Sequence, residues 1–142
     1  MKTRIVFASM SLLGLLSVSS FAEVPVWKTE LVDAICPGSR AVEIEFDRKN
    51  DLYLGYTGCG QEDLQTTGAV PSILKIAKRS SQAWLKEIVD TSSVDVGRHP
   101  NISFDTNNGL HVIYSDHESW RMKHAYRAAG KSSYEIQEVG SD

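Results

Sequence analysis

The chain has 142 residues, of which 42% are hydrophobic and 23% are charged, and its formal net charge at pH 7 is −3. This length allows one domain at most, and the acidic balance argues against nucleic acid or an anionic membrane surface as a partner.

The first predicted element is a secretory signal peptide, residues 1–22. Lys2 and Arg4 form a short positive region, residues 5–18 are largely apolar, and Ser20-Phe-Ala22 offers a cleavage site of small residues. A retained membrane anchor is the alternative, but the apolar run is too short and wrongly flanked for a spanning helix. After cleavage 13 basic and 18 acidic residues remain, with no further apolar stretch of spanning length. We therefore expect a secreted or periplasmic protein without a membrane span.

Two cysteines, Cys36 and Cys59, follow the signal peptide. In an oxidising compartment such a pair is usually a disulfide, whereas a metal site or a catalytic thiol needs partners at ligand spacing, and the sequence offers none. The link would close a loop of 24 residues. On the chain-entropy model a loop of this size contributes about 3 kcal/mol.

The mature chain repeats itself. Trp27-Lys-Thr-Glu-Leu-Val-Asp33 returns as Trp84-Leu-Lys-Glu-Ile-Val-Asp90 after 57 residues, and more weakly as Tyr134-Glu-Ile-Gln-Glu-Val139 after a further 50. Other segments recur in the same order, at spacings of 58 and 48 residues: 46–47 with 104–105, 52–56 with 110–114, and 73–79 with 121–127. Periods of this length indicate a repeat architecture.

Each repeated segment has the pattern of a β-strand. Val42, Ile44 and Phe46 alternate with acidic residues, and 110–114 alternates in the same way, which is typical of a half-buried strand. Turn signals separate the strands, among them Asp105-Thr-Asn-Asn-Gly109, which half-resembles a calcium loop but lacks the later bidentate Glu. After residue 22 no segment has a convincing hydrophobic period of an α-helix. The sequence predicts an all-β fold.

Four successive antiparallel strands of about 45 residues are typical of one blade of a β-propeller. We expect one blade at 41–90 and a second at 99–139. Residues 24–33 are expected to form a lone strand that corresponds to the fourth strand of a blade, so that 23–142 forms a partial propeller. The pattern resembles the blade repeats of secreted bacterial β-propellers, both propeller lectins and sialidase-like propellers. It is carried by Phe104, Asp105, Gly109, Tyr114, Lys123, Ala125, Trp84, Glu87, Val89 and Asp90. Ser115-Asp-His-Glu-Ser-Trp120 departs from the sialidase Asp-box because it lacks the central Gly.

Two blades do not close a ring, so two blade faces would stay open. The resemblance implies two solutions: self-association into a ring, as in two-blade lectins, or membership of a longer propeller. Because strands alternate in direction, the connections at 91–100 and 115–120 meet at one end of the second blade. They supply the candidate ligand-binding residues Trp120, Asp116, His117, Arg98 and His99. An aromatic ring beside charged groups suits a sugar, although Trp120 could instead pack on a neighbouring blade.

The sequence predicts no metal site, cofactor or catalytic residue. No two of the four histidines have ligand spacing, and no nucleophile motif appears. Acidic residues that recur in both blades are expected to be framework. The leading hypothesis is an exported binding module with a glycan ligand. The alternatives are a fragment of a propeller enzyme of the glycosidase or lyase type, or a segment that docks another protein or serves a structural role.

Overall fold

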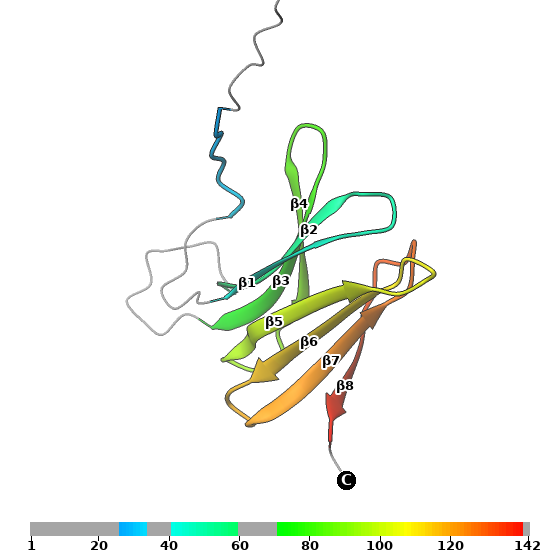
Figure 1. Ribbon diagram of the computed structural model, residues 1–142. Helices are drawn as coiled ribbons and strands as arrows, with labels where there is room; N and C mark the ends of the chain where they lie inside the picture. Colours follow the sequence, from blue (N-terminus) through cyan, green and yellow to red (C-terminus); the bar gives the residue numbers. More distant parts are fainter. Residues whose placement is uncertain (1–25, 34–40, 60–70, 141–142) are drawn as a thin grey trace, which may run out of the picture.

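The computed structural model describes residues 26–33, 41–59 and 71–140, and in these ranges the chain forms two four-stranded antiparallel sheets and no helix. Figure 1 shows that each sheet is a meander with its strands in chain order. The first sheet contains β1 (Val42–Phe46), β2 (Leu52–Cys59), β3 (Ser72–Arg79) and β4 (Trp84–Asp90). The second contains β5 (Val96–Phe104), β6 (Leu110–Asp116), β7 (Arg121–Arg127) and β8 (Glu135–Val139). The all-β prediction is confirmed.

The first hairpin of each sheet is built in the same way. Asp47 accepts backbone N–H groups two and four residues further on, at 2.8 and 2.9 Å, and Asp105 does the same at 2.8 and 2.7 Å. Asn50 and Asn108 occupy the same place in the two turns, with φ of 64° and 66°. Asn tolerates this left-handed conformation, so the local sequence is sufficient for both turns.

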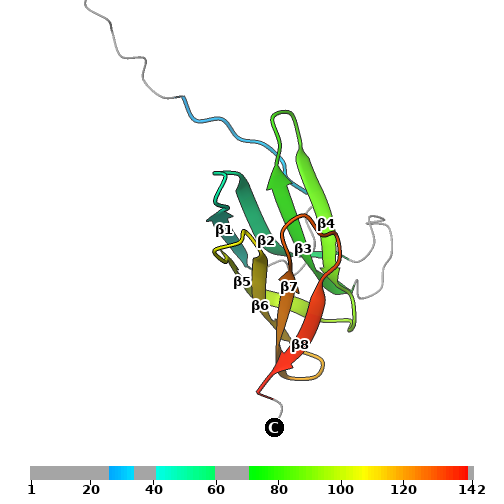
Figure 2. The same ribbon diagram turned by 90° about the vertical axis from the view of Figure 1, so that its right-hand side faces the viewer.

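The two sheets stack face to face, and most of the hydrophobic core lies between them (Figure 2). From the second sheet, Ile102, Val112 and Ala125 enter this core and are at most 3% exposed. Opposite them the first sheet offers Gly55, where an added Cβ would lie 2.7 Å from the Ile102 Cγ2 atom. Glycine at this position therefore lets the sheets approach closely.

The other face of the first sheet, which we call the outer face, is largely uncovered. Val42, Ile44 and Phe46 are 62%, 59% and 51% exposed, so the expectation that these residues form the buried side of a half-buried strand is wrong. Their alternation places them on one face as predicted, but no second sheet covers that face in the described part of the chain. Leu54 and Ala77, nearer the middle of the same face, are buried.

Residues 26–33, expected to form a lone strand, have no strand conformation; the predicted residues 24 and 25 lie outside the described ranges. A strand needs a hydrogen-bonded neighbour, and no described strand pairs with this segment. The segment instead contacts the outer face through its side chains. Val32 packs beside Leu54 and Ala77 in a small second cluster.

The polar contacts of this segment repeat those between the two sheets. The Tyr56 hydroxyl donates to Asp33 at 2.9 Å, and the Tyr114 hydroxyl donates to Asp90 at 2.7 Å. Both tyrosines and both aspartates are equivalent positions of the sequence repeat. A lysine of the same repeat position joins each pair, Lys75 at 3.1 Å from Asp33 and Lys123 at 3.6 Å from Asp90.

A second set of contacts, two ion pairs, also repeats between the segment 26–33 and β4. Arg79 pairs with Glu30 at 3.0 Å, and Arg127 pairs with Glu87 at 2.6 Å. Glu30 and Glu87 are repeat-equivalent, as are the two arginines. The segment 26–33 therefore contacts the first sheet as β4 contacts the second sheet.

Several predictions fall outside the described residues. The signal peptide does so entirely, and so does Cys36, while Cys59 is a buried residue at the end of β2. The disulfide between them stays a prediction. Within the described ranges, no helix has the length and apolar character needed to cross a membrane.

Candidate functional site

The connection between β4 and β5 and the connection between β6 and β7 lie at the same end of the second sheet, as expected (Figure 1). Hydrogen bonds join them. The backbone N–H of His117 donates to the carbonyl of Asp95 at 2.9 Å, and the backbone N–H of Val94 donates to a Glu118 carboxylate oxygen at 3.0 Å. The two connections thus form one platform.

Asp116 supports this platform from beneath. It is 2% exposed, its Oδ2 accepts from Lys123 Nζ at 2.7 Å, and its Oδ1 accepts from the Ser93 hydroxyl at 2.8 Å. Burial would raise the pKa of Asp116, but the hydrogen bonds from Lys123 and Ser93 hold it well below its ordinary value. With these partners, Asp116 is a framework residue rather than an open ligand contact.

Arg98 is also engaged within the protein. Its guanidinium makes two contacts of 2.6 Å with the carboxylate of Asp95, three residues earlier. About 30% of the Arg98 side chain is exposed. Arg98 therefore lies at the edge of the platform with most of its charge balanced.

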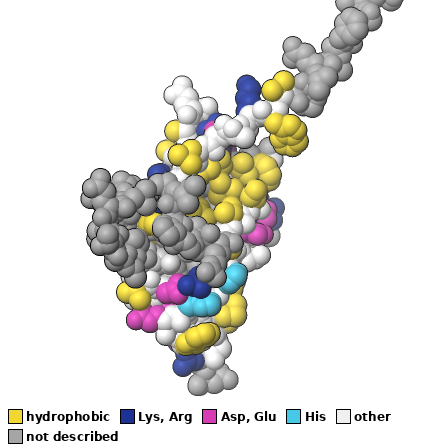
Figure 3. Space-filling model, turned by 90° about the vertical axis from the view of Figure 1, so that its left-hand side faces the viewer, with side chains coloured by type: hydrophobic (Ala, Val, Ile, Leu, Met, Phe, Trp, Pro, Cys, Tyr) yellow, Lys and Arg dark blue, Asp and Glu magenta, His cyan; other side chains and the backbone are white. Residues whose placement is uncertain are grey.

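The remaining three predicted residues come together as a row of rings. The centroids of His99 and His117 are 6.4 Å apart, and those of His117 and Trp120 are 5.4 Å apart. Trp120 is 83% exposed, so among the described residues it does not pack on a neighbouring sheet. On the side of the molecule seen in Figure 3, histidine side chains gather at the lower end beside acidic, basic and hydrophobic ones.

The backbone is strained at the Trp120 end of this row. His99 and Trp120 have φ of 50° and 54°, and the other non-glycine residues with positive φ in the described chain are the turn residues Asn50 and Asn108. Asn and His adopt this conformation more readily than other residues, whereas the bulky Trp120 there is an outlier that costs of order 1–3 kcal/mol. Such strain is often found at binding sites, where it serves to position a side chain.

A second polar group lies on the face of the second sheet that points away from the first. His111 Nδ1 lies 3.0 Å from His124 Nε2, His111 Nε2 lies 3.4 Å from Asp105, and Gln137 Nε2 lies 3.2 Å from His124 Nδ1. With both rings neutral, Gln137 donates to His124, His124 donates to His111, and His111 donates to Asp105. Burial, together with the neighbouring His111, lowers the pKa of His124.

The sequence interpretation missed this pair because it compared the histidines along the chain. The register of the β6–β7 hairpin pairs Ile113 with His124 and His111 with Tyr126, which makes the two histidines diagonal neighbours. The position of the turn between β6 and β7 in the sequence sets this register, so the proximity of the two histidines could have been deduced from it. A pocket of about 430 Å³ lies in front of the pair.

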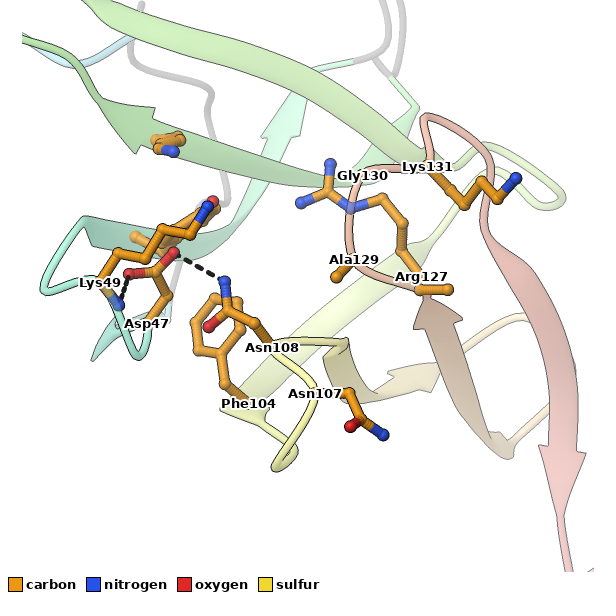
Figure 4. A pocket seen from close by; sticks show the side chains of 12 residues that line it. Asp47, Lys49, Phe104, Asn107, Asn108, Arg127, Ala129, Gly130 and Lys131 are labelled. Atoms are coloured by element: carbon orange, nitrogen blue, oxygen red, sulfur yellow. Dashed lines mark hydrogen bonds between the residues drawn. The ribbon is translucent and has the colours of Figure 1, made fainter.

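A third feature is a pocket of about 460 Å³ between the two sheets, at the end opposite the platform (Figure 4). Asp47, Lys49 and Asn108 lie on one side of it, and Arg127 with the 128–131 turn lies on the other. Among the described residues, no group of three or more His, Cys, Asp or Glu side chains is placed to hold a metal ion.

No family model matches this chain, and no curated protein or solved structure matches it.

Proposed function

We propose that the chain is part of an exported β-propeller-type protein that acts as a binding module, with glycans as the ligand class and the row of His99, His117 and Trp120 as the contact surface. The observation that carries the ligand proposal is Trp120, a widely exposed indole held in a strained backbone beside the ring of His117. An exposed aromatic face stacks on the apolar C–H patch of a sugar, and the nearby polar groups can bind its hydroxyls.

The propeller proposal rests on the repeated contacts. A propeller places each blade on the next in the same way. Here Asp33 and Glu30 contact the first sheet as Asp90 and Glu87 contact the second. The segment 26–33 would then correspond to the last strand of a preceding blade.

The uncovered outer face also supports an incomplete ring. Its Ile44 is the repeat equivalent of Ile102, which the first sheet buries. In a longer propeller another blade would cover Ile44, and in the isolated chain a second copy would cover it. A head-to-tail contact of the same geometry is unfavourable, because the outward face of the second sheet carries Ile113 where the first sheet has Gly55.

The test of the ligand proposal is a screen of immobilised glycans with the purified protein and its Trp120→Ala variant. We expect binding by the protein and a loss of about five- to tenfold in the variant, since stacking on a single aromatic ring contributes about 1 kcal/mol and a factor of ten corresponds to about 1.4 kcal/mol. Trp27→Ala is the matched control, because Trp27 is 96% exposed and lies outside the platform. Equal losses in both variants, or no glycan bound, would contradict the proposal.

A further inference from the structure

The pocket between the sheets is positively charged in a protein whose net charge is negative. Four basic residues and one acidic residue line it, while the whole chain carries a formal charge of −3. The acidic member, Asp47, already accepts hydrogen bonds from Asn108 Nδ2 at 3.0 Å and from two backbone N–H groups. Its carboxylate is thus held by the framework. The basic members are Lys49, Lys78, Arg127 and Lys131.

Two of the four cations are balanced by carboxylates. Lys78 pairs with Asp51 at 2.7 Å, and Arg127 pairs with Glu87 at 2.6 Å. In the part of the chain that the structure describes, Lys49 forms no such pair, and in Figure 4 its side chain extends across the Asp47 side of the pocket. Lys131 lies on the rim. The pocket therefore has an excess of positive charge.

The basic residues are not explained by the repeat. Arg127 has the repeat equivalent Arg79 and is framework, but the equivalents of Lys49 and Lys78 in the second sheet are Asn107 and Tyr126. Residues that maintain the fold recur in both sheets, whereas a binding site is needed only once. Lys49 and Lys78 are therefore candidates for a function specific to this pocket.

The floor and walls add further chemistry. Tyr53 and Phe104 pack with their ring centroids 4.9 Å apart and offer an aromatic surface. Asn107 and Asn108 add amide groups on one wall. A volume of about 460 Å³ falls in the range of small-molecule sites and exceeds what an inorganic ion needs.

We infer that this pocket binds an acidic monosaccharide of the uronic acid type. Lys49 and Lys78 bind its carboxylate, the asparagines bind its hydroxyls, and the Tyr53–Phe104 surface contacts its C–H groups. Charge-assisted hydrogen bonds make the carboxylate the strongest anchor. The site lies at the opposite end of the molecule from Trp120 and is independent of the glycan site proposed there.

The test is calorimetric titration of the purified protein with glucuronate, glucose and inorganic phosphate at low ionic strength. We expect glucuronate to bind more tightly than phosphate, and glucose not to bind measurably. Lys49→Gln should weaken glucuronate binding severalfold, and the pair Lys49→Gln with Lys78→Gln should weaken it by at least about tenfold. The single variant keeps the Lys78–Asp51 pair and guards against a loss of folding.

A matched control removes the same charge elsewhere, by Lys28→Gln with Arg121→Gln, and should leave binding unchanged, as should Trp120→Ala. Absence of glucuronate binding, phosphate binding as tight as glucuronate binding, or an equal loss in the charge control would each overturn the inference. A failure of the Trp120 site alone would leave glucuronate binding intact, so the two proposals fail separately.

Discussion

Ile44 of the first sheet and Ile102 of the second occupy the same position of one repeat, yet Ile44 is 59% exposed and Ile102 is 3% exposed. Their neighbours also correspond, including the buried alanines Ala77 and Ala125 in the third strands. The difference is what lies opposite: the first sheet covers Ile102, whereas among the described residues it is the segment 26–33 that approaches the face that holds Ile44. Repeat-equivalent residues are therefore expected to contribute differently to the free energy of unfolding, depending on whether another sheet packs on them.

The largest difference is expected from truncating the two isoleucines. Ile102→Ala removes buried methyl groups and leaves a cavity beside Gly55, so it should lower the free energy of unfolding by about 2–5 kcal/mol. Ile44→Ala, at an exposed position, should change it by less than about 1 kcal/mol. Urea denaturation followed by fluorescence, at a protein concentration low enough to keep the chain monomeric, measures both. Equal effects in the monomer would show that the chain itself covers the outer face.

The repeated aspartates give a smaller contrast. Asp90 is 4% exposed and accepts from Tyr114, so Asp90→Asn should lower the free energy of unfolding by about 2–4 kcal/mol, because it weakens a buried charged network. Asp33→Asn should have a smaller effect, about 1 kcal/mol, because its segment covers only part of the first sheet. The same denaturation experiment applies. An Asp33 variant as unstable as the Asp90 variant would indicate that the segment is as firmly packed as β4.

A third prediction concerns acid. Burial would raise the pKa of both Asp90 and Asp116, but hydrogen bonds from Tyr114 and Lys123 respectively keep each pKa below its ordinary value. A lowered pKa in the folded state means that the unfolded chain binds more protons, so stability is fully present above about pH 4–5 and is lost as the pH falls below it. The free energy of unfolding measured from pH 7 to pH 3 should fall mainly below pH 4.

Asp116→Asn should be less stable at neutral pH and should flatten that acid limb, because its side chain no longer titrates. Glu118→Gln is the control, since Glu118 accepts a single exposed backbone hydrogen bond and should leave the acid limb unchanged. An unaltered acid limb in the Asp116 variant would contradict its role as a buried framework carboxylate.

The elements of the fold could be predicted because they depend on local sequence. Alternation fixed which residues share a face, and Asp47 and Asp105 specify their turns through hydrogen bonds to residues two and four positions away. Which sheet face is buried could not be predicted, because burial depends on which other part of the protein packs against that face. For that reason the sequence assigned Val42, Ile44 and Phe46 to a buried side, and the structure exposes them.

The candidate site was predictable to a similar extent. The alternation of strand direction brought the two connections together, and His99, His117 and Trp120 form the row that results. The role of Asp116 could not be predicted, because its partner Lys123 lies on the adjacent strand and only the register places them 2.7 Å apart. The basic pocket likewise combines residues from both sheets, and their proximity is a property of the packing.

The most direct test of an incomplete ring is the mass of the purified protein in solution, measured by light scattering for the wild type and for Ile44→Glu. We predict that the wild type associates through the outer face of the first sheet, and that Ile44→Glu shifts it to the monomer while the fold is kept. A wild-type protein that is a monomer at all concentrations, melts cooperatively and binds no hydrophobic dye would contradict the claim that this face needs a partner.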